Sequence, residues 1–237
     1  MAALLAVCVF FSPAFASVTI IGTRVIYPAS EKEVTVRLDN RGDKPALVQT
    51  WIDDGDPVQP VDKTNVPFVL LPPVFRMEAG KGQTLRMIYT GSDLPIDKES
   101  VFWLNILDIP PKVKSHTSEN LLQMAIRSRI KIFYRPASLN AEGANQAASS
   151  LIWRKNNKSK LLTAVNHSPY YINVSQVSAE DGAGHKYVSE RGDMLAPGET
   201  KDFVMKGGII NQLKPTIHYQ YLDDLGAARS VVGQLSQ

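Results

Sequence analysis

The sequence predicts an all-β protein made of two immunoglobulin-like β-sandwich domains. Helical periodicity is almost absent, and short runs rich in β-branched and aromatic residues recur along the 237-residue chain with turn residues between them. The regular spacing of these runs is typical of sandwich strands. The chain beyond residue 16 is also long enough for two sandwiches of ordinary size.

The first sixteen residues, MAALLAVCVFFSPAFA, combine an apolar run with a small-x-small ending at Ala14-Phe15-Ala16. This pattern is typical of a secretory signal peptide, although no basic residue follows Met1. A membrane anchor needs about 20 apolar residues, and this run is shorter. We therefore expect residues 1–16 to be a signal peptide cleaved after Ala16, and the exported chain to be soluble, with no membrane insertion.

The only cysteine, Cys8, lies inside this expected signal peptide, so the exported chain would contain no thiol. Small exported domains commonly depend on disulfides, and a chain without them depends on packed cores. The formal net charge of +3 does not demand an anionic polymer as partner. Proteins that bind single-stranded nucleic acid place aromatic side chains between their basic residues, so that bases can stack on them. No aromatic residue alternates with Arg127, Arg129 and Lys131, so we expect no nucleic-acid partner.

The first predicted domain, residues 17–137, contains seven runs with strand character. The run at 33–39 alternates polar and apolar residues cleanly before the turn Asn40-Arg41-Gly42-Asp43. The full set covers residues 17–20, 33–39, 46–52, 68–71, 84–89, 101–109 and 121–134.

The second predicted domain, residues 138–237, is a smaller sandwich. The texture of the sequence changes after Pro136, and residues 140–150 (NAEGANQAASS) are small and polar, which we interpret as a hinge or loop. Strand-like runs resume at residues 161–165, 170–177, 201–205, 217–221 and 231–232.

Motifs that would carry catalysis or bind a metal are not found in the sequence. The four histidines are scattered without zinc-binding spacing, and no G-x-S-x-G, P-loop or G-x-G-x-x-G pattern is present. The doublets Asp53-Asp54 and Asp223-Asp224 follow strand-like runs, and we interpret them as turn acids because adjacent strand residues point to opposite faces. We expect no enzyme activity, no metal and no cofactor.

The segment 121–133 is long for a strand, whose usual length is about 5–6 residues. Leu122, Met124 and Ile126 would share one face of it, opposite the basic residues. Two interpretations remain open. These three residues belong to the core of their own sandwich, or they form an apolar row on an edge strand that pairs with another chain.

Arg24 allows two interpretations as well. It is a solvated residue at the rim of a strand, or it joins Lys131 to hold a carboxylate, since arginine offers a planar fork and lysine a point charge. Sequence spacing does not decide between them.

The segment 94–110, LPIDKESVFWLNILDIP, resembles the signature of the PapD-like family of periplasmic pilus-assembly chaperones. The resemblance rests on the triplet 97–99, Trp103, Asn105 and the closing Ile109-Pro110. Supporting matches are spread over the rest of the chain: residues 23–25, 51–52, 72–74 and 127–136 in the first domain, and 166–171 and 195–198 in the second.

The resemblance implies two immunoglobulin-like domains in an L or boomerang arrangement, located in the periplasm. It implies a chaperone that caps pilus or fimbrial subunits, which lack a strand, by donating one of its own, and that delivers them to an outer-membrane usher. Leu122, Met124 and Ile126 would then enter the groove of the pilin subunit. The lack of cysteines around the segment between Pro111 and Leu121 implies the short-loop subfamily.

Two further sets of residues take roles from the resemblance. Arg24 and Lys131 match the pair that anchors the terminal carboxylate of the subunit. Glu99, Arg135 and Asp224 match an ion network between the domains. The alternative that we keep is an exported two-domain immunoglobulin-like adhesive or structural module, which would need neither the carboxylate pair nor the long strand.

Overall fold

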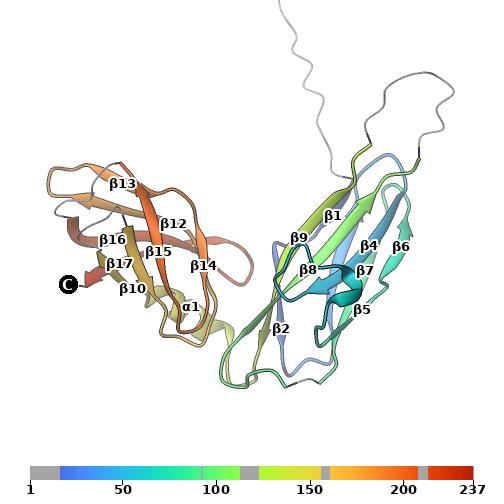
Figure 1. Cartoon of the computed structure of the whole chain (residues 1–237), viewed down its shortest axis with the longest axis horizontal. Coiled ribbons are helices and arrows are strands. Elements are labelled where there is room, and N and C mark those ends of the chain that lie inside the picture. The colour runs from blue at the N-terminus through green and yellow to red at the C-terminus, as the bar shows by residue number, and fades with distance from the viewer. Residues whose placement is uncertain (1–16, 92, 113–122, 156–160, 208–212, 237) are drawn as a thin grey trace, which may run out of the picture.

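The computed structural model describes residues 17–91, 93–112, 123–155, 161–207 and 213–236. Two β-rich lobes meet near the residues that connect them and diverge above that point, as Figure 1 shows. The only helices among the described residues are α1 (Ala141–Ser149) and the 3-10 turn η1 (Val61–Lys63). The predicted all-β, two-domain fold is confirmed.

The first domain consists of two stacked sheets. The strand order in the four-stranded sheet is β1-β3-β7-β5, and in the five-stranded sheet it is β2-β9-β8-β4-β6. Strand β3 illustrates why these residues form a sandwich, because Val36 and Leu38 are buried while Thr35 and Arg37 are exposed. The bounds are β1 (Val18–Ile20), β2 (Arg24–Pro28), β3 (Val34–Asn40), β4 (Ala46–Asp53), β5 (Phe68–Leu71), β6 (Val74–Met77), β7 (Gly82–Tyr89), β8 (Ser100–Ile109) and β9 (Ile126–Arg135).

The chain changes sheets between β1 and β2. Strand β1 pairs with β3 in one sheet, and β2 pairs in parallel with β9 in the other. Gly22 lies at the crossing with φ of 110°, a conformation that residues with a Cβ rarely adopt. This crossing brings Arg24 beside Lys131, its partner in the β2–β9 register.

Strand β9 is paired unevenly along its two edges. On one edge it pairs with β8 from Ile126 to Tyr134. On the other, β2 covers only Lys131 to Arg135. No other strand among the described residues pairs with the part from Ile126 to Ile130, so that half of β9 has an open edge.

In the second domain the strands form a ring of hydrogen-bonded neighbours. The strand order is β13-β15-β11-β10-β17-β16-β12-β14, and β13 also pairs with β12, so the two faces are joined at both edges. The bounds are β10 (Ile152–Lys155), β11 (Leu161–Val165), β12 (Ile172–Asp181), β13 (Lys186–Ser189), β14 (Asp193–Leu195), β15 (Thr200–Lys206), β16 (Leu213–Leu222) and β17 (Ala228–Ser236).

Each domain has its own hydrophobic core. The first core draws its residues from Val18 to Tyr134 in the sequence, and the second from Leu139 to Leu235. Trp153 is fully buried at the centre of the second core, beside Phe203 and Tyr219. The two cores therefore separate between Tyr134 and Leu139.

The interpretation of residues 140–150 as a hinge or loop was wrong, because residues 141–149 form α1. Asn140 caps this helix by accepting a hydrogen bond of 2.8 Å from the Gly143 amide. Ala147 and Ala148 are buried against the second core. The helix was missed because its sequence is small and polar, and only alanines on one side of it pack against the core.

The sequence patterns also missed five short strands, namely β2, β6, β10, β13 and β14. In addition, β9 begins later than expected. Residues 123–125 are described and are not in a strand, and the residues before them lie outside the described part. Asp108 near the end of β8 pairs with Ile126, so β8 offers almost no partner to residues further back.

Candidate functional site: the cleft between the domains

The cleft between the domains is lined by side chains from one face of β9. Odd-numbered residues of β9 point to this face, while Ile130, Ile132 and Tyr134 pack into or against the first core. Lys131 lies near the middle of the odd-numbered row, and Arg24 lies opposite it on β2. The parallel β2–β9 register therefore fixes two cations side by side.

Both cations reach across to the second domain. Arg24 Nη1 donates a hydrogen bond of 3.1 Å to the Leu222 carbonyl, and Lys131 Nζ donates one of 2.6 Å to Asn173 Oδ1. Arg24 Nε is buried without a hydrogen-bond partner among the described residues. Together with Trp103, Arg129 and neighbouring residues, this pair lines a cleft of about 400 Å³.

Burial disfavours the charged form of both groups. It lowers the pKa of the Arg24 guanidinium, against the opposing effect of Asp224 and Asp223. Burial and then repulsion from Arg24 lower the pKa of the Lys131 ammonium. The positive charges of these two adjacent side chains are thus poorly neutralised, because their hydrogen-bond acceptors carry no negative charge. A carboxylate in the cleft would supply both the missing charge and the missing acceptor.

Of the expected donor row, Ile126 is the first residue of β9 and Met124 lies just before the strand, next to its open half. Met124 is 65% exposed and Ile126 is 43% exposed, so neither belongs to the first core. Leu122 lies outside the described residues. The exposure of Met124 and Ile126 argues against the interpretation that places them in the core of their own sandwich, and their pairing with another chain stays a prediction.

Glu99, Arg135 and Asp224 meet at the junction of the domains. Arg135 Nε lies 2.8 Å from Glu99 Oε1, and its two terminal nitrogens lie 2.7 and 2.9 Å from the Asp224 carboxylate. Glu99 Oε2 also accepts a bond of 2.8 Å from the Tyr171 amide. Burial raises the pKa of Glu99, although Arg135 acts in the opposite direction. The three side chains join the residue just before β8, the end of β9 and the segment after β16.

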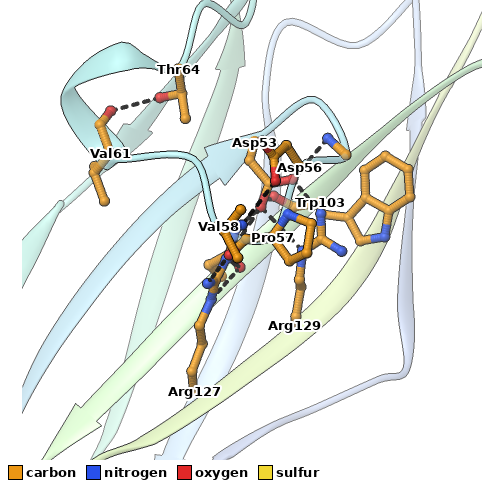
Figure 2. Close-up of polar contacts among 11 residues, drawn as sticks. Asp53, Asp56, Pro57, Val58, Val61, Thr64, Trp103, Arg127 and Arg129 are labelled. Atoms are coloured by element: carbon orange, nitrogen blue, oxygen red, sulfur yellow. Dashed lines mark hydrogen bonds and ion pairs between the residues drawn. The ribbon is translucent and has the colours of Figure 1, made fainter.

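A second charged cluster, which sequence reasoning missed, lies at the end of β4 (Figure 2). Asp53 is only 1% exposed, and its carboxylate contacts Arg129 twice, Asn105 at 2.6 Å and Arg127 at 3.5 Å. It also accepts a bond of 2.9 Å from the Gly55 amide. The interpretation of Asp53 as a turn acid covers its bond with the Gly55 amide but not its burial against two arginines; Asp54 is its exposed neighbour.

Aromatic rings hold both arginines of this cluster. The guanidinium carbon of Arg127 lies 4.9 Å from the Trp51 ring centre, and that of Arg129 lies 4.7 Å from the Trp103 ring centre. Arg127 also donates to Asn105 Oδ1 and to the Pro57 carbonyl. Burial raises the pKa of Asp53, but the hydrogen bonds from Arg129, Asn105 and Gly55 outweigh it and hold that pKa below its ordinary value.

A pattern in the sequence could have revealed the cluster. Trp51 and Asp53 alternate on one strand, Trp103 and Asn105 on another, and Arg127 and Arg129 on a third. Residues two apart in a strand share a face, so three such pairs on neighbouring strands would meet. The order of the strands was the missing information.

Comparison with known proteins decides the family. The model for the N-terminal domain of PapD, described as a pili and flagellar-assembly chaperone, matches residues 17–140, and the model for the C-terminal domain of the pili-assembly chaperone PapD matches residues 146–232. The chain belongs to the PapD-like chaperone family. The resemblance seen in the sequence is confirmed.

Individual relatives agree with this assignment. Chaperone protein FimB/FhaD of Bordetella pertussis is 42% identical over 89% of this chain and 85% of its own length. The crystal structure of the Pseudomonas aeruginosa CupB2 chaperone has a TM-score of 0.78 and 34% identity, covering 92% of this chain and 100% of that one. The Salmonella enterica SafB chaperone, solved in complex with the SafA pilin, gives a TM-score of 0.77 and 26% identity, covering 94% of this chain and 99% of that one.

Proposed function

We propose that this chain is a pilus-assembly chaperone that holds a pilin subunit along the open half of β9 and delivers it to an outer-membrane usher. The observation that carries the proposal is that β9 has an open edge along its first half, with exposed apolar residues at its start (Ile126) and just before it (Met124), and that the Arg24–Lys131 pair lies where this open edge ends. SafB, a family member with the same fold, is solved with a pilin bound.

Strand donation solves a physical problem of an incomplete subunit. A sandwich that lacks a strand exposes apolar surface and a row of unpaired backbone groups, and both are unfavourable in water. The open half of β9 supplies the backbone partners, while Leu122, Met124 and Ile126 supply the apolar side chains. Arg24 and Lys131 then take the terminal carboxylate of the subunit and fix the position of its last residue.

The inter-domain network has a structural role in this proposal. Glu99, Arg135 and Asp224 hold the second domain at a fixed angle to β9, so that the cleft keeps its width. A buried ion network is better evidence for fixed geometry than for net stability. Residues 17–137 and 138–237 are the two proposed domains.

The protein acts by binding in this proposal and not by chemistry. Among the described residues, no group of three or more histidine, cysteine, aspartate or glutamate side chains is arranged to hold a metal ion. The same part of the chain contains no helix of the length and apolar character that a membrane span requires. We place the protein in the periplasm after cleavage of residues 1–16, which lie outside the described residues.

The decisive experiment removes the anchor. We expect Arg24→Ala and Lys131→Ala each to abolish co-purification of a co-expressed pilin subunit while the variant chaperone keeps its circular dichroism spectrum. Arg41→Ala and Lys44→Ala are matched controls, because both residues are exposed and lie in the same domain. If the two anchor variants capture pilin as well as the parent does, the alternative of an adhesive or structural module becomes the better description.

A further inference from the structure

The cleft face of β9 carries more cations than one carboxylate needs. Arg127, Arg129 and Lys131 follow each other at two-residue intervals on that face, and Arg24 stands beside Lys131. Arg129 and Lys131 line the same cleft. A client that ends in a carboxylate therefore has more than one cation within reach along the same edge.

This spacing creates an ambiguity of register. A shift of one residue turns every side chain of a client strand to the wrong face, so the apolar row excludes it. A shift of two residues, about 6.6 Å along a strand, returns every side chain to its original face. The alternation of apolar side chains cannot exclude that shift, and Arg129 stands where the shifted carboxylate would arrive.

The charged cluster of Asp53 resolves the ambiguity. Arg129 gives Nε and one terminal nitrogen to Asp53, while Arg127 gives its nitrogens to Asn105, Asp53 and the Pro57 carbonyl. Figure 2 shows both arginines turned toward Asp53. Among the described residues, in contrast, the side chains of Lys131 and Arg24 donate hydrogen bonds only to neutral acceptors, and Arg24 Nε has no hydrogen-bond partner.

We propose that Asp53 determines the register of the bound client, because it occupies Arg129 and Arg127 and leaves only the Arg24–Lys131 pair to take the terminal carboxylate. This inference rests on the proposed function and deepens it. Asp53 is a positioning residue that acts through the arginines and does not touch the client. Asn105 supports it by donating to Asp53 and accepting from Arg127.

The test measures register directly. The probe is a synthetic alternating threonine–valine peptide with a free terminal carboxylate and one cysteine. The cysteine is placed to lie opposite Ile126 when the carboxylate is at Lys131, and opposite Met124 after a two-residue shift. Ile126→Cys and Met124→Cys report the two registers by disulfide formation, since the chain from Ser17 onward has no other cysteine.

With Asp53 unchanged, the peptide should form its disulfide mainly with the Ile126→Cys variant. With Asp53→Asn, the ratio of the two disulfides should move toward Met124→Cys by about tenfold, the scale of one charge-assisted hydrogen bond. Adding Arg129→Gln to Asp53→Asn should restore the parent ratio, because the competing cation is gone. Asp54→Asn, an equal change of charge on an exposed neighbour, should leave the ratio unchanged.

The possible failures are distinguishable. An unchanged ratio in a folded Asp53→Asn variant overturns the register role and leaves the proposed function standing. A parent ratio that is the same for the peptide and its C-terminal amide overturns the carboxylate anchor and the register role together. Should Asp53→Asn not fold, Arg129→Lys keeps a cation at position 129 and the charge of Asp53, but an ammonium cannot bind Asp53 through two nitrogens in the way that the Arg129 guanidinium does. This variant should then shift the ratio in the same direction, and an unchanged ratio overturns the register role.

Discussion

Removing Glu99 should weaken the junction between the domains more than removing Asp224. Its side chain is 2% exposed, compared with 29% for Asp224. Glu99→Ala deletes the contact with Arg135 Nε and leaves the partly buried Tyr171 amide without its acceptor. Breaking a buried ion pair in this way costs about 3–5 kcal/mol. At about 2–4 °C per kcal/mol for a chain of this size, the melting midpoint should fall by about 6–20 °C.

Glu99→Gln separates charge from hydrogen bonding at the same site. The amide oxygen can still accept from the Tyr171 amide, so only the charge opposite Arg135 is lost, at a cost of about 1.5–3 kcal/mol. Asp224→Asn should cost less than Glu99→Ala, because its carboxylate is partly solvated. Thermal unfolding gives the order, and small-angle scattering reports the angle between the domains.

The result that would refute this reasoning is an unchanged melting midpoint together with an unchanged scattering profile for Glu99→Ala. Equal losses for Glu99→Ala and Glu99→Gln would also contradict it. In that case the Tyr171 hydrogen bond would contribute nothing to the junction.

Three further predictions concern other parts of the chain. N-terminal sequencing of the exported protein should begin at Ser17, and a product that retains Cys8 would contradict cleavage after Ala16. Met124→Glu should fail to capture pilin although the chaperone stays folded, because it places a charge in the client's apolar groove; co-purification tests this, and normal capture would exclude Met124 from the donor row. The Asp181 pKa is held at about 2, first by the hydrogen bond with the His185 ring and further by the Ala183 and His185 amides and the Tyr187 hydroxyl. The stability from Asp181 should be complete above pH 3.8 and disappear as the pH falls toward 2, so acid unfolding of Asp181→Asn, followed by circular dichroism, should begin from a lower stability but lose less of it over that range.

Much of the first domain could be predicted because several of its strands alternate buried and exposed residues. The run at 33–39 shows this best, and it matches β3 to within one residue at each end. Short strands such as β6 and β14, with four and three residues, are too short for a period of two to stand out. Helix α1 was missed because its apolar face consists of alanines.

The candidate site divides in the same way. Glu99, Arg135 and Asp224 were named from a family resemblance, and their proximity depends on strands far apart in the sequence. Asp53 had no local signal of the cluster, because its side-chain partners are 52 to 76 residues away in the chain. The fold brings these distant arginines to Asp53, so the residues next to Asp53 in the sequence give no sign of the cluster.

Strand β9 also sets a limit on how this protein can be altered. Its ten consecutive residues include the open edge, the lysine that we propose as an anchor and the inter-domain arginine. Inserting or deleting one residue between Ile126 and Arg135 would move every side chain on one side of the change to the opposite face of the strand, relative to those on the other side. An engineer who wishes to redirect the chaperone to another client can therefore substitute side chains within β9 but cannot change its length.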